Sequence, residues 1–245
     1  MATELIVATI SAVVALVAAA ITIWGQTRNA RLQAQLRREE EADKRKREAK
    51  RLITRYREPL IHAAFDLQSR VYNFLELQLI DLHYVNGSER SRQYVINNTA
   101  YLIAQYFGWS EVLRQDGLFL DLGEMERTRK LNELQDKITH TWLRDDLGSD
   151  LCIFKGNQRV IGEEMIKSEE DGLNCLTYGE FLRAIEDDKH EYLQLLREDL
   201  LNVIDNINLV RSRLVLLQNA LIDLINFLDP GYVRFPKNRR SKLEA

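Results

Sequence analysis

Proline, glycine and cysteine are scarce in this chain of 245 residues, and each scarcity excludes a class of structure. Three prolines and 11 glycines are too few for the many turns of a β-sandwich or barrel, and they favour long helices. Two cysteines, Cys152 and Cys175, cannot form a disulfide framework or a zinc site built from Cys-x-x-Cys pairs. Because 45% of the residues are hydrophobic, the chain is nevertheless expected to fold.

The sequence also lacks the motifs of familiar enzymes. Its glycines are too scattered for a phosphate-binding or dinucleotide-binding loop, and no serine lies in a Gly-x-Ser-x-Gly turn. The four histidines stand apart, without a second histidine or an acidic residue at metal-ligand spacing. The acidic run 145–150 lacks the ligand spacing of an EF-hand loop. We therefore predict no catalytic residue, no cofactor and no metal site.

Charge is absent from one long stretch, residues 5–24. As a helix, these twenty residues rise about 30 Å, which matches the hydrocarbon core of a bilayer. A signal peptide normally opens with basic residues, whereas residues 1–4 contain none. The stretch therefore predicts a transmembrane helix rather than a cleaved signal peptide. The predicted membrane-anchoring residues are Leu5, Ile10, Val14, Ala18 and Trp24.

Arginines follow this stretch directly, whereas only Glu4 precedes it as a charged side chain. The positive-inside rule then leaves residues 1–4 outside the cell and places the rest of the chain in the cytoplasm. The predicted localisation is the cell membrane, with a single pass. Arg28 and Arg31 stand nearest to the predicted membrane and are expected to contact lipid headgroups.

Residues 25–57 are basic, with twelve Lys or Arg against five Asp or Glu, and they are rich in helix-forming residues. This composition predicts a helical stalk. A heptad seam that begins at Leu32 and Leu36 continues with Glu39 and Asp43, so the stalk is expected to be a solvated spacer and not a coiled coil. Its basic run 44–47 is compatible with anionic lipid or with nucleic acid, but specific for neither.

Residues 58–230 are acidic and carry apolar residues at the spacing of helices. Glu58-Pro59 predicts a bend or a fresh helix start, and Gly108 predicts a helix stop. Asp121 with Glu124, and Thr177 with Glu180, have the spacing of capping boxes. The predicted helical segments are 60–82, 92–106, a short one after Ser110, 125–142, 177–185 and 200–228, with a bend of the last one near Asn206 left open.

Strands are predicted at one place only. Residues 151–154 and 159–161 are apolar enough for two short strands, and residues 155–158 between them have the composition of a turn. The predicted fold is mainly α: a transmembrane helix, a charged helical stalk, and a multi-helix bundle with one small β-hairpin. A basic tail, residues 231–245, ends the chain.

Four segments resemble an uncharacterised family of bacterial proteins that have a single membrane-spanning anchor. They are residues 55–60 together with 64–70, residues 104–109, residues 154–161 and residues 223–230. The resemblance implies a shared helical domain behind an N-terminal anchor. It supplies no activity, cofactor or site residue.

The leading functional hypothesis is a single-pass membrane protein that presents a cytoplasmic helical interaction or scaffold domain. Its expected partners are the lipid bilayer and a protein, and a homo-oligomer through the anchor or the body is compatible with the sequence. Nucleic acid is disfavoured because the body is acidic and no aromatic residues alternate with the bases.

Two other hypotheses stay open. The first is a membrane-tethered enzyme with an unfamiliar site around Tyr106, Trp109 and the group Asp66, Gln68 and Arg70, for which a deep polar pocket would be the sign. The second is a lipid or nucleic-acid binder that uses the stalk and the cations of the tail. Those cations are Arg234, Lys237, Arg239, Arg240 and Lys242.

Overall fold

The computed structural model describes the backbone of residues 2–115, 125–170 and 172–244. It describes the side chains of residues 22–44, 47, 55–115, 126–170 and 172–244. The chain divides into two compact units, residues 1–51 and residues 52–245, which are described separately.

The fold class is confirmed as mainly helical with one small antiparallel hairpin. Longer α-helices alternate with short 3₁₀ segments and a single π-helical segment, η1. The elements are α1 (Ala2–Leu75), η1 (Ile80–Val85), α2 (Glu89–Gln115), α3 (Met125–Leu143), η3 (Asp145–Leu147), α4 (Lys155–Glu164), β1 (Ile166–Glu169), β2 (Gly172–Cys175), α5 (Tyr178–Ala184), α6 (Glu191–Ile204), η4 (Ile207–Val210), α7 (Arg211–Leu228) and η5 (Lys237–Arg239).

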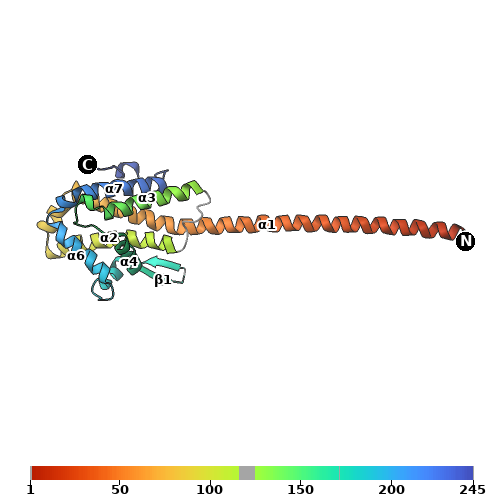
Figure 1. The fold of residues 1–245 in the computed structure, drawn as a ribbon, viewed down its shortest axis with the longest axis horizontal. Coiled ribbons are helices and arrows are strands. Elements are labelled where there is room, and N and C mark those ends of the chain that lie inside the picture. Colours follow the sequence, from red (N-terminus) through yellow and green to blue (C-terminus); the bar gives the residue numbers. More distant parts are fainter. Residues whose placement is uncertain (1, 116–124, 171, 245) are drawn as a thin grey trace. The chain divides into compact units, whose positions relative to one another are not determined.

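The second unit is a bundle in which α2 is central. Helix α2 packs against α4, α6 and the strand β2, while α3 packs along α7 (Figure 1). The segment of α1 from Tyr56 to Val71 contributes its buried face to the main core. Phe74 belongs to a smaller cluster with Ile80, Val95, Ile96 and Ile204. Helices from distant parts of the sequence therefore share the main hydrophobic core.

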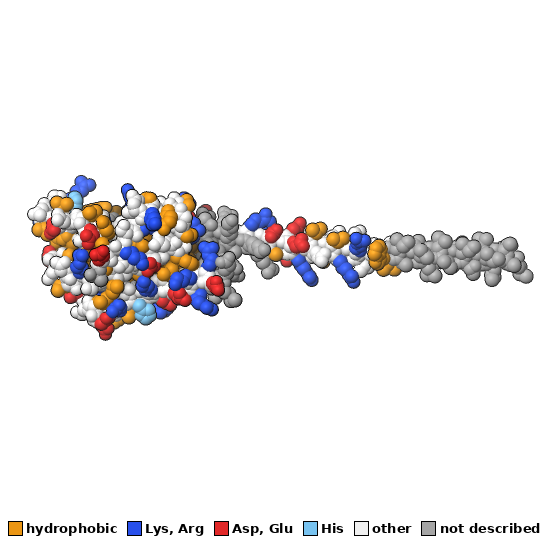
Figure 2. Space-filling view, turned by 90° about the horizontal axis from the view of Figure 1, so that it is seen from above, with side chains coloured by type: hydrophobic (Ala, Val, Ile, Leu, Met, Phe, Trp, Pro, Cys, Tyr) orange, Lys and Arg blue, Asp and Glu red, His pale blue; other side chains and the backbone are white. Residues whose placement is uncertain are grey.

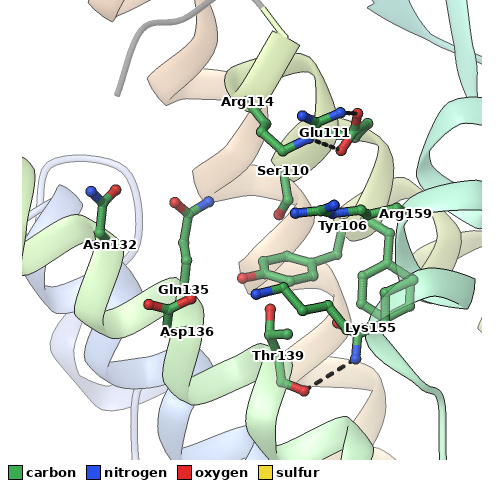
Figure 3. A pocket seen from close by; sticks show the side chains of 12 residues that line it. Tyr106, Ser110, Glu111, Arg114, Asn132, Gln135, Asp136, Thr139, Lys155 and Arg159 are labelled. Carbon is green, nitrogen blue, oxygen red and sulfur yellow. Dashed lines mark hydrogen bonds and ion pairs between the residues drawn. The ribbon is translucent and has the colours of Figure 1, made fainter. Parts of the chain in front are cut away.

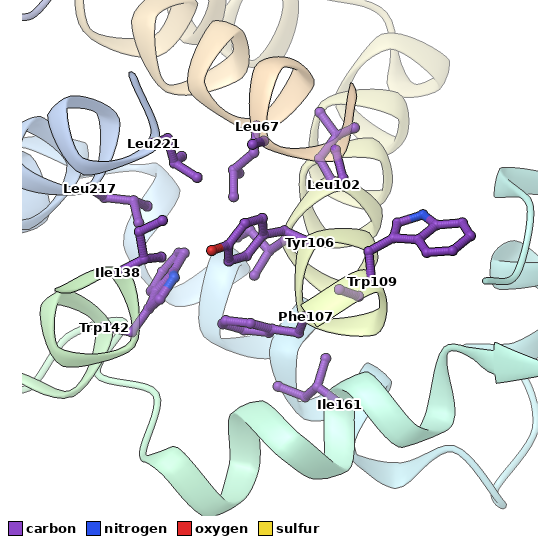
Figure 4. Packing of buried hydrophobic residues seen from close by; sticks show 14 of the residues in the cluster. Leu67, Leu102, Tyr106, Phe107, Trp109, Ile138, Trp142, Ile161, Leu217 and Leu221 are labelled. Carbon is purple, nitrogen blue, oxygen red and sulfur yellow. The ribbon is translucent and has the colours of Figure 1, made fainter. Parts of the chain in front are cut away.

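Aromatic rings mark the centre of this core. The rings of Phe107 and Trp142 meet edge to face with their centroids 5.7 Å apart, and Trp142 is fully buried (Figure 4). Arg213 is buried beside them and donates hydrogen bonds of 2.6–2.9 Å to the carbonyl oxygens of Thr141, Trp142, Arg144 and Gly148. These bonds satisfy carbonyl groups that a helix end leaves without intrahelical partners, so Arg213 caps the C-terminus of α3.

The first unit contains the portion of α1 up to Arg51. The side chains of residues 26–44 are exposed, including Leu32 and Leu36. Along this portion four arginines, at 28, 31, 37 and 38, are followed by the acidic residues 39–41 and 43 (Figure 2). Within the part of the chain that the structure describes, none of the helices combines the length and the apolarity needed to cross a bilayer.

Two predicted helix boundaries in the second unit are wrong. Helix α1 continues through Pro59, so the fresh helix start expected there does not occur. A proline inside a helix removes one backbone hydrogen bond, and here Tyr56, Leu60 and Ile61 around it are buried in the core. Helix α2 likewise continues through Gly108, so Ser110 lies inside it and does not cap a following helix. A Cβ atom at Gly108 would lie 2.8 Å from Cys175 Sγ. This glycine therefore permits close packing and does not end the helix.

The predicted position of the hairpin is also wrong. Residues 155–164 form α4, and the hairpin follows it, with Ile166 paired to Cys175 and Glu169 paired to Gly172. The turn-like residues 155–158 are the first turn of a helix whose buried face is formed by Gln158, Ile161 and Gly162. That face recurs every three to four residues and packs on α2, which favours the helix over a strand.

The predicted helices 60–82 and 200–228 do not run as continuous α-helices over their predicted ranges. Leu82, expected to point inward, is 58% exposed, because residues 80–85 form a π-helical segment instead of a continued α-helix. The predicted helix 200–228 is broken: α6 ends at Ile204, and η4 separates it from α7. Asn206 lies at this break, where its backbone leaves the helical region.

The two predicted capping boxes have different outcomes. Thr177 and Glu180 form both hydrogen bonds of a capping box at the start of α5, as predicted. Asp121 and Glu124 lie outside the described residues.

Candidate functional site

A cavity of about 330 Å³ lies between α2, α3 and α4, within the second unit (Figure 3). Most of its lining residues carry polar side chains, which sets it apart from the core beside it. The lining residues are Tyr106, Phe107, Ser110, Glu111, Arg114, Asn132, Gln135, Asp136, Thr139, Lys155, Gln158 and Arg159.

Helix α2 contributes the floor of the cavity. Glu111 is buried and accepts hydrogen bonds from Arg114 Nε, at 2.7 Å, and from Gln115 Nε2, at 2.9 Å. A second nitrogen of Arg114 completes a two-pronged ion pair with the same carboxylate. Tyr106, one helical turn before Ser110, is buried as well.

Helix α3 contributes a row of four polar side chains: Asn132, Gln135, Asp136 and Thr139. Their spacing of three and four residues places them on one face, next to the apolar residues Leu134 and Ile138 that enter the core. Gln135 Oε1 is buried and has no hydrogen-bond partner among the described residues. This wall of the cavity therefore keeps at least one polar atom, Gln135 Oε1, that a ligand could hydrogen-bond.

Helix α4 contributes the cationic rim. Lys155 and Arg159 are exposed and lie one turn apart, and neither forms an ion pair with a described residue. Gln158 between them is buried and donates to Thr139 O at 3.1 Å and to Ile153 O at 2.8 Å, which fixes α4 against α3. Phe154, which precedes the helix, is 63% exposed beside this rim.

The two buried ionisable groups of the cavity have opposite pKa shifts. Burial raises the pKa of Tyr106 well above its usual range, so its phenol stays protonated. Burial also opposes ionisation of Glu111, but the hydrogen bonds from Arg114 and Gln115 and the charges of Arg114 and Arg159 outweigh it and lower the pKa of Glu111. Near neutral pH, neither group is poised to exchange a proton.

The cavity carries groups that can bind a ligand. Its side chains offer two cations that form no ion pair with a described residue, the carboxylate of Asp136 and several amide and hydroxyl groups. The cavity lining includes no histidine or cysteine that could pair with a base as an activated nucleophile. In the part of the chain that is described, no three His, Cys, Asp or Glu side chains come together as a metal site.

The residues predicted for a possible enzyme site are not brought together. Tyr106 lines the cavity, but Trp109 projects from another face of α2 (Figure 4). Arg70 is buried and donates to Asn98 Oδ1, whereas Asp66, one turn away on α1, is exposed. Gln68 donates to Ser69 Oγ and is also outside this cavity.

The predicted membrane and headgroup residues lie in the first unit. Leu5, Ile10, Val14 and Ala18 belong to α1, but their side chains are outside the described residues. Trp24 is 66% exposed, and the guanidinium carbon of Arg28 lies 5.6 Å from the centroid of its ring. Arg31 is exposed on the same helix. Nothing in these contacts tests the membrane prediction.

The cations of the predicted tail are largely committed to internal contacts. Arg240 is buried and paired with Asp229, Arg234 pairs with Glu58 at 2.7 Å, and Lys242 pairs with Asp223. Lys237 and Arg239 keep exposed side chains without an ion pair among the described residues. A binding surface that needs all five cations is therefore not available.

Sequence reasoning missed most of the cavity because it assigned residues 155–158 to a turn. On a helix, Lys155, Gln158 and Arg159 share one face, and so do the polar residues 132–139 on α3. The available signal was a stripe of polar residues beside the apolar stripe on each of these two helices, which is typical of a helix face that lines a cavity. What the sequence could not give was that α2 brings these stripes together.

Comparisons with protein-family models, with curated proteins and with solved structures find no match for this chain.

Proposed function

We propose that the chain is a membrane-anchored interaction protein whose second unit recognises a partner through the cavity between α2, α3 and α4. In this proposal residues 5–24 anchor the chain in the cell membrane, residues 25–51 are a solvated spacer, and the second unit, which includes the buried Tyr56, faces the cytoplasm. The family resemblance, with its anchor and helical domain, is in keeping with this order of parts.

The observation that carries the proposal is a set of charged side chains at the cavity that form no ion pair with a described residue. Lys155, Arg159 and Asp136 have no ion-pair partner among the described residues, and Phe154 beside them exposes its ring. Exposed aromatic and arginine side chains next to a polar pocket are typical of protein recognition sites. On the face of the second unit drawn in Figure 2, charged side chains of both signs are interspersed.

The protonation states of the cavity favour binding over catalysis. A phenol held protonated and a carboxylate held ionised at neutral pH provide a donor and a structural ion pair, but no general acid or base. No observation favours the enzyme hypothesis specifically.

Crosslinking in intact membranes tests the proposal. We expect the full chain to capture a partner protein that is lost when Lys155 and Arg159 are both replaced by Glu. The control is Lys189→Glu, an exposed lysine of the same unit outside the cavity lining, which should preserve capture. Recovery of the chain alone, or equal loss in both variants, would contradict the proposed recognition site.

The membrane part of the proposal has its own test. The full chain should stay with the membrane fraction in high salt and leave it only with detergent. Protease added outside intact cells should leave the second unit uncleaved. A protein that is soluble without detergent would contradict the anchor while leaving the recognition site open to the crosslinking test.

A further inference from the structure

A second cavity, of about 440 Å³, lies between the end of α1 and the C-terminal segment, residues 231–244. It is separate from the cavity between α2, α3 and α4, with which it shares no lining residue. Its lining consists of Phe65, Gln68, Ser69, Tyr72, Asn73, Leu77, Asn238, Arg239 and Ser241.

The walls of this second cavity are held by buried contacts. The ring of Phe235 stacks on Phe65 with a centroid distance of 3.6 Å and an interplanar angle of 5°. Gln218 is fully buried and donates through Nε2 to Gln68 Oε1, at 3.1 Å, and to Ser241 O, at 2.9 Å. The C-terminal segment is thus fixed on α1, and the cavity between them is part of the folded unit.

Donor groups that make no internal contact converge on this cavity. The side chains of Tyr72, Asn73, Asn238, Arg239 and Ser241 have no hydrogen-bond or ion-pair partner in the described ranges. No carboxylate lines the cavity. Glu76, the residue directly after α1, is paired with Arg211 at 3.5 Å.

The chemistry of these groups defines a ligand class. A guanidinium without a carboxylate beside it attracts an anion, and Arg239 can bind one through two parallel N–H groups. The amides of Asn73 and Asn238 and the hydroxyls of Tyr72 and Ser241 add further donors. A carboxylate offers two oxygens to this set, whereas a phosphate offers three and uses more of the donors.

We propose that the cavity between α1 and the C-terminal segment binds an organic phosphate, with Arg239 on the phosphate group. Phe65 and Leu77 supply an apolar edge for the carbon part of the ligand. The phosphate can belong to a free small molecule or to a lipid headgroup, since both present the same oxygens. Lys237, on the same 3₁₀ turn as Arg239, lies outside the lining.

The test uses the full chain in mild nonionic detergent and three probes: glycerol 3-phosphate, soluble short-chain phosphatidic acid, and acetate. Calorimetry should show that a phosphate probe binds and that acetate binds more weakly. Arg239→Gln should weaken phosphate binding by about tenfold or more, since it removes the charge-assisted bonds. Lys237→Gln removes the same charge two residues away and should change binding by less than about threefold.

The two sources of phosphate are separated by the same titrations. Tighter binding of glycerol 3-phosphate assigns the cavity to a free metabolite, and tighter binding of phosphatidic acid assigns it to a lipid headgroup. Asn73 lines the cavity from α1, and Asn73→Ala should also weaken the binding of either ligand. Equal loss in the Arg239 and Lys237 variants, or no binding of either phosphate probe at millimolar concentration, would overturn the proposal.

Discussion

The guanidinium of Arg240 and the carboxylate of Asp229 form an ion pair in which both side chains are buried, with 1% and 3% exposed. Arg240 Nη1 also donates to Asp229 O at 2.9 Å, and its Nη2 donates to Phe235 O at 2.6 Å. Asp229 in turn accepts from the backbone N–H groups of Val233 and Arg234 at 3.0 Å. The pair therefore folds the chain back after α7 and determines where the C-terminal segment lies.

Asp229→Ala is expected to destabilise the protein by about 3–5 kcal/mol, because it leaves the buried charge of Arg240 without its partner. Urea unfolding of the full chain measures the difference. Lys242→Ala is the matched control, since Lys242 pairs with Asp223 at the surface and such pairs contribute at most about 1 kcal/mol. Similar losses in the two variants would show that the Asp229–Arg240 pair is not buried in solution.

The same pair predicts a dependence of stability on pH. Burial opposes ionisation of Asp229, but the backbone N–H groups of Arg234 and Val233 and the side chain of Arg240 outweigh it, so its pKa in the folded protein lies below its usual value. The stabilisation is fully present above the unfolded pKa of about 4 and is lost as the pH falls through the folded pKa.

Unfolding free energies measured from pH 7 to pH 2 should therefore fall steeply below about pH 4. Asp229→Asn should flatten this fall, whereas Asp188→Asn, at an exposed position, should keep the slope of the unmodified protein. An unchanged slope in the Asp229 variant would assign the acid sensitivity to other carboxylates.

Gly162→Ala should destabilise the protein by about 1–3 kcal/mol, as overpacking of a close contact does. An added Cβ atom would lie 2.8 Å from Phe107 O and 2.9 Å from Glu111 Cβ, where α4 crosses α2. Gly156, on the same helix, has nothing within 4 Å of an added Cβ, so Gly156→Ala should stabilise by about 0.4–1 kcal/mol. Thermal unfolding of both variants gives the comparison, and shifts of the same sign would contradict the close crossing.

Arg213→Lys should cost about 1–3 kcal/mol even though the charge is kept, because an ammonium group cannot reach all four carbonyl oxygens that the guanidinium satisfies. The control Arg211→Lys, at an exposed pair with Glu76, should stay within about 0.5 kcal/mol of the unmodified protein. Denaturant unfolding measures both changes. If Arg213→Lys leaves the stability unchanged, water must hydrogen-bond to the carbonyl groups that Arg213 satisfies.

The two cysteines should react at very different rates with iodoacetamide. Burial raises the pKa of the Cys175 thiol far above its usual range and also blocks access, whereas Cys152 is half-buried. Mass spectrometry after brief labelling of the folded chain should find the label on Cys152, with Cys175 labelled only after unfolding. Equal labelling of both would mean that the hairpin end opens readily.

Periodicity predicts helices well where one face is buried over several turns. The apolar residues 131, 134, 138 and 142 placed α3 correctly, and the Thr177–Glu180 spacing placed the start of α5 because both hydrogen bonds of the box are local. Local chemistry of this kind needs no knowledge of the rest of the fold.

Local signals failed where a tertiary contact decides the outcome. Pro59 and Gly108 break isolated helices, yet here one lies among core residues and the other lets α2 approach Met165 and Cys175. Strands are predicted at 151–154 and 159–161 because residues 155–158 between them resemble a turn, but the same composition also suits the first turn of a helix. Both cavities lie between elements distant in sequence, so composition alone could not locate them.

The buried Gln218 makes the stability of the second unit depend on residues 241–243 near the C-terminus. Its Oε1 accepts from the backbone of Leu243 at 3.2 Å, while its Nε2 reaches α1 and Ser241. Removal of residues 241–245 would take two hydrogen-bond partners, Ser241 O and Leu243 N, from the buried side-chain amide of Gln218, at a cost of about 1–3 kcal/mol for each lost partner. Truncations and affinity tags are therefore better kept away from this end.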